Sequence, residues 1–549
     1  MRPMSLPGRV SSKLFLVKTL AEAGILHPTW PDRIVSAANA LIRFGPTPAA
    51  GYKASAARYP DETAVIDERG TATFSEINAR SNALAHALSD AGVNEGDNLG
   101  LMMRNHRGFV EALVACSKLG CNALFLNTAF SGPQLTEVCR REKPKALLYD
   151  EEFAEVLHDA GRRRLRYIAW HEAGGNGPGR SDPTLDELVE AGDRSEVIAP
   201  ASPGKAIILT SGTTGTPKGA SRSQPKSLDP AAALLDRIPL KARERTMVAA
   251  PLFHAWGFAH FTIGMGLSST LVLHRKFDPE VTLSLTAQHE CTALVVVPVM
   301  LQRILALDDE ILQRYDLGDL RVVPVSGSAL PGAISERWMD LFGDNLYNLY
   351  GSTEVAWATI ATPEDLRAAP GTAGRIPRGT VVRVYDDDAR HIEAPGETGR
   401  IFVGNDLQME GYTGGGGKDS IDGLMSSGDV GHFDSDGRLF IDGRDDDMIV
   451  SGGENVFPQE VEELLQHHDA VEEVAVFGVD DDEFGQRLKA VVVRRKRMTL
   501  TEKEVQDHVK QNLAGYKVPR DVAFIAELPR NATGKVLKRE LLEEPDSGS

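Results

Sequence analysis

The spacing of apolar residues changes several times along the chain, and each spacing predicts a different kind of element. Between residues 98 and 149, short apolar runs alternate with stretches of helical spacing. The expected strands are 98–102, 123–126 and 146–149, and the helices between them are 107–119 and 131–141. The same rhythm resumes with strands expected at 205–209, 246–249, 269–273, 292–297 and 321–325. Strands that alternate with helices predict a doubly wound parallel sheet and therefore an α/β fold.

The residues before this region predict helices and a short hairpin. An amphipathic helix is expected over 12–25, packed on the protein surface rather than against a membrane. Two short strands are expected within 62–75, around the turn Glu68-Arg69-Gly70. A helix is then expected over 75–91, ending at Gly92.

The pattern changes again beyond residue 371 and predicts two smaller units. Short strands separated by Gly and Asp are expected at 381–385, 399–403 and 439–441, which indicates a β-rich subdomain over about 371–443. A charged hinge is expected at 444–447. The remaining residues, 448–549, predict a small α+β domain, and residues 1–443 form the large N-terminal domain. The elements expected in the small domain are helices 458–466 and 501–513 and strands 471–478, 488–494 and 522–526.

Composition restricts the classes of protein that fit. The 549 residues are 42% hydrophobic and 25% charged, which excludes collagen-like, low-complexity and wholly disordered chains. The formal net charge of −18 disfavours nucleic-acid partners, so a bound polyanion needs a local pocket of opposite sign. The four cysteines form no CxxC pair, so we expect reduced thiols in a cytoplasmic protein. No apolar run approaches the ~20 residues of a membrane span.

The most informative segment reads TSGTTGTPKG, from Thr210 to Gly219, and follows an expected strand. Its glycines permit close backbone approach, and its consecutive amides and hydroxyls form a cradle for an anion. Lys218 adds a positive charge. The segment is not a Walker A loop, because Pro217 replaces the second glycine and Gly219 replaces the final Ser or Thr. It predicts a phosphate-binding loop outside the Walker class.

This loop resembles the phosphate loop of the acyl-adenylate-forming superfamily, which comprises acyl-CoA synthetases, adenylation domains of peptide synthetases and beetle luciferases. Three further motifs of that family follow in order and extend the resemblance over about residues 45–545. They are Tyr350-Gly351-Ser352-Thr353-Glu354, then Ser427-Gly428-Asp429 with Gly443-Arg444, and finally Pro529-Arg530-Asn531-Ala532-Thr533-Gly534-Lys535. The resemblance implies doubly wound sheets in the large domain and a small mobile C-terminal domain that rotates between two half-reactions.

The resemblance also implies a site for ATP and Mg²⁺. Thr353 is expected near the α-phosphate, and Glu354 is expected to bind the metal, since Mg²⁺ prefers carboxylate and phosphate oxygens. The nucleotide-binding residues implied are Thr210, Ser211, Gly212, Thr213, Thr214, Gly215, Lys218, Gly327, Ser328, Tyr350, Gly351, Ser352, Asp429 and Arg444.

Adenine and ribose have their own expected partners within this set. Tyr350 is expected to cover one face of the adenine, and the SGSA segment 326–329 the other, although SGSA also suits a simple turn. Asp429 is expected to accept hydrogen bonds from both ribose hydroxyls, a geometry that a carboxylate provides. Arg444 is expected to complete the ribose site.

The acyl-transfer residues implied by the resemblance lie in four places. Lys535 is expected to bridge the substrate carboxylate and the α-phosphate, and Asp446 to act as the hinge. Gly452 and Gly453 are expected to line the tunnel for the pantetheine arm of coenzyme A. His254 is expected to border the carboxylate and to gate the acyl or thiol channel. The expected catalytic residues are thus His254, Thr353, Glu354 and Lys535.

Alternatives stay open for the segment around His254. A packed core histidine also fits this position. Trp256 and Phe258 are expected to shape the acyl pocket, but their spacing of two equally suits an ordinary strand. Two departures from the family are also visible. The segment 412–420 lacks the helix start that often follows Gly-Tyr, and Val450 stands where some members carry a lysine.

The hypothesis that follows is a stand-alone acyl-CoA synthetase of the fatty-acid–CoA-ligase type. It joins a carboxylic acid, expected to carry an apolar acyl group, to coenzyme A through an acyl adenylate, with release of AMP and diphosphate. One alternative is an enzyme that performs a single half-reaction, either adenylation for a separate acceptor or thioesterification of preformed acyl-AMP. Another is a non-catalytic protein that binds nucleotide or coenzyme A. The sequence leaves the acid's identity open, and also the choice between monomer and homodimer.

Overall fold

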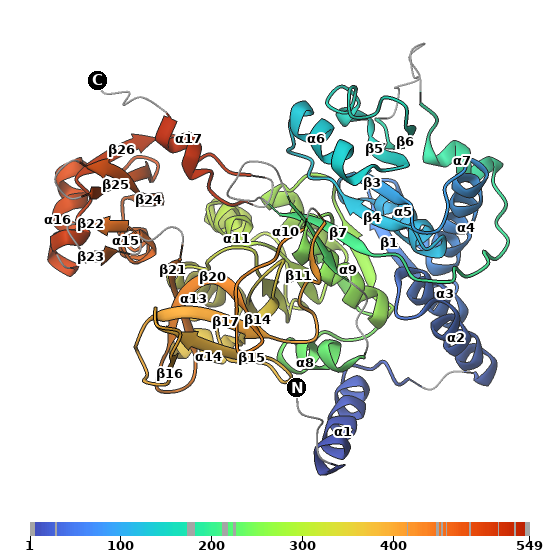
Figure 1. Cartoon of the computed structure of the whole chain (residues 1–549), viewed down its shortest axis with the longest axis horizontal. Coiled ribbons are helices and arrows are strands. Elements are labelled where there is room, and N and C mark those ends of the chain that lie inside the picture. The colour runs from blue at the N-terminus through green and yellow to red at the C-terminus, as the bar shows by residue number, and fades with distance from the viewer. Residues whose placement is uncertain are drawn as a thin grey trace. The chain divides into compact units, whose positions relative to one another are not determined.

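The chain folds into two compact units, each built from three separate stretches of sequence. In the computed structural model the described residues are 6–27, 30–172, 182–210, 218–222, 227–413, 415–445, 449–451, 454–456, 458–481, 485–513, 515–531 and 534–543. The first unit comprises Met1–Val296, Ala306–Pro324 and Asp406–Gly417. The second comprises Val297–Leu305, Val325–Asn405 and Lys418–Ser549. The chain therefore passes between the units several times (Figure 1).

The first unit contains a seven-stranded sheet in the order β18-β8-β7-β4-β3-β5-β6. Its strands are β3 (Asn98–Met102), β4 (Asn122–Phe125), β5 (Ala146–Asp150), β6 (Leu165–Trp170), β7 (Ala206–Thr210), β8 (Lys218–Arg222) and β18 (Gly411–Tyr412). The five strands from β7 to β6 are parallel, whereas β8 and β18 run antiparallel to their neighbours. This sheet confirms the α/β architecture expected from the alternating strands and helices.

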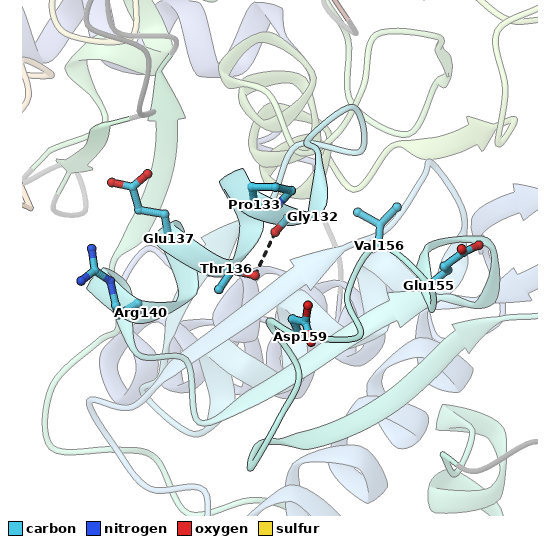
Figure 2. A pocket seen from close by; sticks show the side chains of 8 residues that line it. All are labelled: Gly132, Pro133, Thr136, Glu137, Arg140, Glu155, Val156 and Asp159. Carbon is cyan, nitrogen blue, oxygen red and sulfur yellow. Dashed lines mark hydrogen bonds between the residues drawn. The ribbon is translucent and has the colours of Figure 1, made fainter.

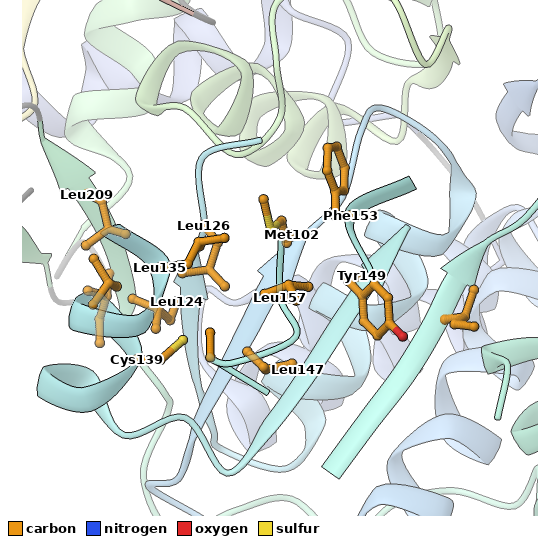
Figure 3. Close-up of a cluster of buried hydrophobic side chains, with 14 residues drawn as sticks. Met102, Leu124, Leu126, Leu135, Cys139, Leu147, Tyr149, Phe153, Leu157 and Leu209 are labelled. Atoms are coloured by element: carbon orange, nitrogen blue, oxygen red, sulfur yellow. The ribbon is translucent and has the colours of Figure 1, made fainter. Parts of the chain in front are cut away.

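Alternating side chains of these strands pack against helices on opposite faces of the sheet. Leu124 of β4 belongs to an apolar cluster that includes Leu135 and Cys139 of α6 (Gly132–Glu142), as Figure 3 shows. The neighbouring Phe125 points the other way and stacks on Phe109 of α5 (Arg107–Lys118), with ring centroids 5.7 Å apart. Both faces of a parallel sheet are buried in this way, which explains the continuous apolar runs in its strands.

A five-stranded sheet in the order β11-β9-β10-β1-β2 completes the first unit. Its strands are β1 (Thr63–Asp67), β2 (Gly70–Thr73), β9 (Arg245–Val248), β10 (Thr270–Leu273) and β11 (Ala293–Val295). The helices of this unit outside the seven-stranded sheet are α1 (Leu6–Glu22), α2 (Pro31–Phe44), α3 (Pro48–Arg58), α4 (Phe74–Asp90), α7 (Leu185–Ala191), α8 (Asp229–Arg237), α9 (Ala255–Leu267), α10 (Pro279–Gln288) and α12 (Asp309–Leu312). A short 3-10 helix, η1 (Glu151–Phe153), follows β5. None of the described helices is long and apolar enough to cross a bilayer.

The second unit begins with a hairpin and an antiparallel sheet. The hairpin pairs β13 (Leu346–Ser352) with β14 (Ala356–Ala361), and the chain enters this unit within β12 (Val323–Val325). The sheet has the order β16-β15-β17-β20-β19, with β21 paired to β20. Its strands are β15 (Val381–Tyr385), β16 (His391–Ile392), β17 (Gly399–Gly404), β19 (Ser420–Ile421), β20 (Leu424–Phe433) and β21 (Leu439–Arg444). The helices are α11 (Pro298–Leu305), α13 (Gly332–Phe342) and α14 (Pro363–Ala368).

The C-terminal part of the second unit has its own sheet and core. Strands β23-β22-β25-β24 lie in that order, and β26 pairs in parallel with β25. The elements are β22 (Ile449–Ser451), β23 (Glu454–Val456), α15 (Pro458–Gln466), β24 (Val471–Asp481), β25 (Gly485–Arg494), α16 (Glu502–Asn512), η2 (Gly515–Lys517), β26 (Asp521–Ile525) and α17 (Lys538–Glu543). Val461 and Val505 of the two larger helices pack with Val476 and Val492 of the central strands. The α+β arrangement matches the expected elements, while the hinge at 444–447 and the boundary after it remain predictions.

The structure decides two expectations, one on the cysteines and one on the segment of Trp256 and Phe258. All four cysteines are buried and free of disulfides, which confirms that they are reduced thiols. A strand through Trp256 and Phe258 is wrong, because both residues lie in helix α9. The helix is favoured by close packing at Gly257, where an added Cβ would lie 2.2 Å from the carbonyl oxygen of Pro251.

Candidate functional site

The Tyr350–Glu354 motif forms the tip of the β13–β14 hairpin. Gly351 is required there, since a Cβ would lie 1.9 Å from the carbonyl oxygen of Ala356. The Ser352 hydroxyl accepts hydrogen bonds from the backbone amides of Glu354 and Val355, at 3.2 and 3.3 Å. Because these bonds fix the turn, the half-buried side chains of Thr353 and Glu354 project from a defined backbone.

Tyr350 and Asp429 connect this hairpin to the antiparallel sheet. The Tyr350 hydroxyl donates a 2.6 Å hydrogen bond to Asp429 Oδ2. Arg444 Nη1 donates to Oδ1 of the same carboxylate at 3.2 Å. Asp429 on β20 stands directly opposite Arg444 on β21, so the strand register holds the pair together. The structure thus brings together three of the residues predicted to bind the nucleoside.

Opposing interactions act on the pKa of the Asp429 carboxyl. Burial raises the pKa of this carboxyl, and the hydrogen bond from Tyr350 and the positive charge of Arg444 act in the opposite direction. Burial also raises the pKa of Tyr350 well above its usual value, so the phenol stays protonated and donates. Each oxygen of a carboxylate offers more than one acceptor position. Asp429 can therefore keep its protein partners while it accepts hydroxyl donors from a ligand.

Lys418 is a further cation of this site that sequence reasoning did not assign. Its positive charge opposes the rise that burial causes in the pKa of Asp429, and its Nζ lies 3.1 Å from the position of a Cβ on Gly428. Gly428 has a φ of +83°, a conformation that favours glycine. Lys418 follows a glycine run that carries no recognisable phosphate motif. The sequence therefore gives no sign that this lysine lies beside Gly428 and Asp429.

The SGSA segment and the Lys535 turn lie beside the same short stretch of chain. Gly327 follows β12 with a φ of +107°, and a Cβ on it would lie 3.4 Å from Val297 Cγ1. A Cβ on Gly534 would lie 2.2 Å from Val299 Cγ1. The turn is closed by the backbone amide of Lys535, which donates to Asn531 Oδ1 at 2.9 Å. The Lys535 turn therefore packs against Val299, two residues after the Val297 that lies beside Gly327. The exposed Lys535 side chain extends from this turn.

His254 stands at the start of α9 in the first unit. It occupies the N-cap position, but its side chain makes no capping hydrogen bond. Among the described residues its Nε2 is buried with no hydrogen-bond partner, and the same holds for Nε2 of His260, six residues further on. Burial lowers the pKa of both histidines to about 3, so both imidazoles are neutral at physiological pH. The role expected for His254 beside the substrate carboxylate stays a prediction.

The phosphate loop connects two paired strands. Thr210 at the end of β7 stands opposite Lys218 at the start of β8, so the loop closes a hairpin. Gly219 allows close packing, since a Cβ there would lie 2.6 Å from Thr413 Oγ1. The expected positions that lie outside the described residues are Ser211, Gly212, Thr213, Thr214, Gly215, Asp446, Gly452 and Gly453.

A separate surface pocket of about 550 Å³ contains none of the predicted site residues (Figure 2). It lies between α6 and the segment 155–159. Glu137, Glu155 and Asp159 line it, with Arg140 as the only basic residue of its lining. Three carboxylates repel polyphosphates, so this pocket does not suit ATP or coenzyme A.

Within the described ranges no three His, Cys, Asp or Glu side chains come together to hold a metal ion. A single carboxylate, Glu354, combined with phosphate oxygens suits Mg²⁺ that arrives with a nucleotide, because this ion retains several waters and needs few protein ligands.

The α/β architecture and these motifs define an adenylate-forming enzyme. Residues 52–413 match the family model of AMP-binding enzymes, and residues 460–535 match that of the AMP-binding enzyme C-terminal domain. The chain belongs to this family. The predictions of the acyl-adenylate-forming superfamily, its fold and the acid–thiol ligase class are therefore confirmed.

Individual relatives support the same assignment. The chain is 32% identical to indoleacetate–CoA ligase of Aromatoleum aromaticum, over 88% of this chain and 95% of the relative. It is also 32% identical to feruloyl-CoA synthase of an Amycolatopsis species, over 88% and 96%. Among solved structures it is similar to o-succinylbenzoate-CoA synthetase from Bacillus subtilis in complex with its acyl-adenylate intermediate. The TM-score is 0.78 and the identity 27%, with 91% of this chain and 99% of the other covered.

Proposed function

We propose that this enzyme converts a carboxylic acid, ATP and coenzyme A to an acyl-CoA, AMP and diphosphate. The observation that carries the proposal is the Tyr350–Asp429–Arg444 group, since it assembles two motifs separated by 79 positions into one partly satisfied carboxylate site. In the first half-reaction a carboxylate oxygen of the acid attacks the α-phosphorus, and the bond to the bridging oxygen of diphosphate breaks. In the second, the coenzyme A sulfur attacks the acyl carbon, AMP leaves, and the thiol proton passes to solvent.

Each predicted residue has a place in this scheme. The amides of the 211–217 loop and Lys218 hold the outer phosphates, and Thr353 lies at the α-phosphate. Mg²⁺, held by Glu354 and phosphate oxygens, would neutralise charge that develops on diphosphate. The positive charge of Lys535 holds the substrate carboxylate beside the α-phosphate, two anions that otherwise repel each other.

The acyl group is proposed to be apolar and aromatic or otherwise cyclic. The named substrates of the relatives, indoleacetate and ferulate, have this character. The chain also places aromatic side chains on α9, where the Phe258 ring lies 5.0 Å from that of Phe125 and 6.3 Å from that of Phe261. Trp256 is held by a hydrogen bond from its Nε1 to the carbonyl oxygen of Val296, at 3.0 Å. A cytoplasmic location is proposed on the basis of the free thiols.

A panel of carboxylic acids with ATP and coenzyme A tests the function. Aryl-acetic, cinnamic, bicyclic and straight-chain fatty acids are each scored for AMP and for thioester. We expect both products in equal amounts with at least one cyclic acid. Acid-dependent exchange of diphosphate into ATP without any thioester would indicate an enzyme of the first half-reaction only. Neither product with any acid, although the protein is folded, would contradict the proposal.

A further inference from the structure

Helix α2 has apolar side chains on two opposite sides. Ala40 and Phe44 are buried, and Phe44 packs with Ala49 and Ala50 of α3 and with Ala199. The other side carries Ile34, Val35, Leu41 and Ile42, which are 51%, 68%, 52% and 82% exposed. At about 100° per residue these four positions fall within a stripe of about 120°. The 72% exposed Trp30 precedes the helix and extends the stripe, and these five residues are called the outer face of α2.

Exposed apolar residues are concentrated in this part of the chain. Eight of the fifteen exposed large hydrophobic side chains among the described residues lie between positions 14 and 42. The three outside the outer face are Leu14, Val17 and Leu26. Scattered exposed hydrophobic residues are normal, whereas a continuous stripe on one helix marks a surface that contacts something.

The charge of the same segment is opposite to that of the rest of the protein. Residues 1–58 contain eight Lys or Arg and two acidic residues, Glu22 and Asp32, which gives a net charge of +6. The whole chain carries −18, so the other residues together carry −24. The exposed Arg43 lies 3.8 Å from the exposed Glu196, whereas Lys53, only 13% exposed, pairs with the same carboxylate at 2.8 Å. Exposed ion pairs are weak and exchange readily with other anions.

We propose that the outer face of α2 lies in the surface of an anionic lipid bilayer. Its apolar side chains would enter the boundary between headgroups and acyl chains, and exposed cations such as Arg43 of the same helix, 39% exposed, would contact lipid phosphates. A Trp at the end of the stripe is typical of such an interface. Since α2 has 14 residues, it lies along the membrane surface and does not cross it.

A second copy of this chain is a poorer partner for the same face. A two-fold dimer places identical surfaces against each other. Two segments of net charge +6 would then face one another and repel. An anionic bilayer combines an apolar layer with negative charge, which complements both properties of the segment. The proposal does not depend on the proposed ligase activity.

Co-sedimentation of the full chain with vesicles tests this proposal. We expect binding to vesicles that contain phosphatidylglycerol, weaker binding to pure phosphatidylcholine, and a decrease as salt is raised. The triple variant Ile34→Ser, Leu41→Ser, Ile42→Ser should bind the anionic vesicles about tenfold less tightly or worse. A matched control replaces three exposed hydrophobic residues elsewhere, Ile198→Ser, Leu228→Ser and Met498→Ser, and should bind as the wild type does.

Two further measurements make the outcome unambiguous. Brominated lipids should quench the fluorescence of the wild type more than that of Trp30→Phe, which places Trp30 in the bilayer. Circular dichroism checks that the triple variant is folded. Equal binding of the triple variant and the wild type would overturn the proposal, as would absence of binding to anionic vesicles. A concentration-dependent dimer that the triple variant abolishes, without vesicle binding, would instead assign the face to contact between copies.

Discussion

The Tyr350–Asp429 hydrogen bond can be tested by a variant that removes one oxygen atom, the hydroxyl of Tyr350. Tyr350→Phe removes the hydroxyl that donates to Asp429 Oδ2 at 2.6 Å and keeps the ring that is expected to cover the adenine. Burial already raises the pKa of Asp429, and the hydrogen bond from Tyr350 opposes that rise. Without this donor the pKa rises further, and the carboxyl becomes neutral at a higher pH.

The magnitude follows from the strength of a hydrogen bond to a charged group, about 1.5–3 kcal/mol. At 1.36 kcal/mol per pKa unit, the pKa of Asp429 should rise by about one to two units. A protonated carboxyl cannot accept from both ribose hydroxyls. The acidic limb of kcat/KM for ATP should therefore move upward by about one to two pH units, and below it the rate should fall about 10- to 100-fold.

The assay is the pH dependence of diphosphate exchange, measured with ATP as the varied substrate. Tyr385→Phe is a matched control, because the Tyr385 hydroxyl also donates to a carboxylate, Asp422 Oδ2 at 3.0 Å, away from the predicted residues. KM for the carboxylic acid should stay unchanged in both variants. If the acidic limb of Tyr350→Phe coincides with that of the wild type, or if Tyr385→Phe shifts it equally, the electrostatic reasoning is refuted.

Three other variants test the hairpin, the core and the C-terminal turn. Gly351→Ala pushes a Cβ to 1.9 Å from the carbonyl oxygen of Ala356 and should lower the free energy of unfolding by about 2–4 kcal/mol in urea, with loss of adenylation. Gly266→Ala, which has nothing within 4 Å, should change it by less than about 1 kcal/mol. Lys118→Met removes an ammonium that donates to four oxygen acceptors within 2.9 Å and should cost about 2–3 kcal/mol. Burial lowers the pKa of Lys118 to about 7, below its unfolded value of 10.5, so the folded wild type binds fewer protons between these values. Its stability relative to the Met variant should thus increase as pH rises from 7 toward 10, and a decrease would contradict this sign. Lys535→Ala should reduce diphosphate exchange about 100-fold or more yet still form thioester from supplied acyl adenylate; equal loss of both reactions would show a general structural role.

Local pattern was sufficient to predict many elements of the fold. The expected strands 98–102 and 381–385 and the helix 458–466 have the observed bounds, because their apolar periodicity agrees with their tertiary burial. The segment around Trp256 could not be decided in this way. Two aromatic residues spaced by two fit either element, and the close approach of Gly257 to the preceding loop involves three-dimensional packing that spacing does not reveal.

The candidate site likewise has residues that the sequence motifs indicated and contacts that only the structure shows. Motif resemblance identified Tyr350, Asp429 and Arg444, but it gave no indication that the phenol donates to the carboxylate. Neither Lys418 beside Gly428 nor the unpartnered nitrogen of His260 carries a sequence signature. Such relations between distant residues depend on strand register and on burial, which a single sequence does not specify.

The discontinuous first unit has a consequence for synthesis on the ribosome. Its seven-stranded sheet is completed only by Asp406–Gly417, which supplies β18 next to β8. A nascent chain that has emerged only to residue 400 exposes the β8 edge with unpaired amides and carbonyls, a template for aggregation. Translation must therefore proceed through two stretches of the second unit, Val297–Leu305 and Val325–Asn405, before the first unit is finished. Truncated expression products that end before residue 406 should accordingly need chaperones.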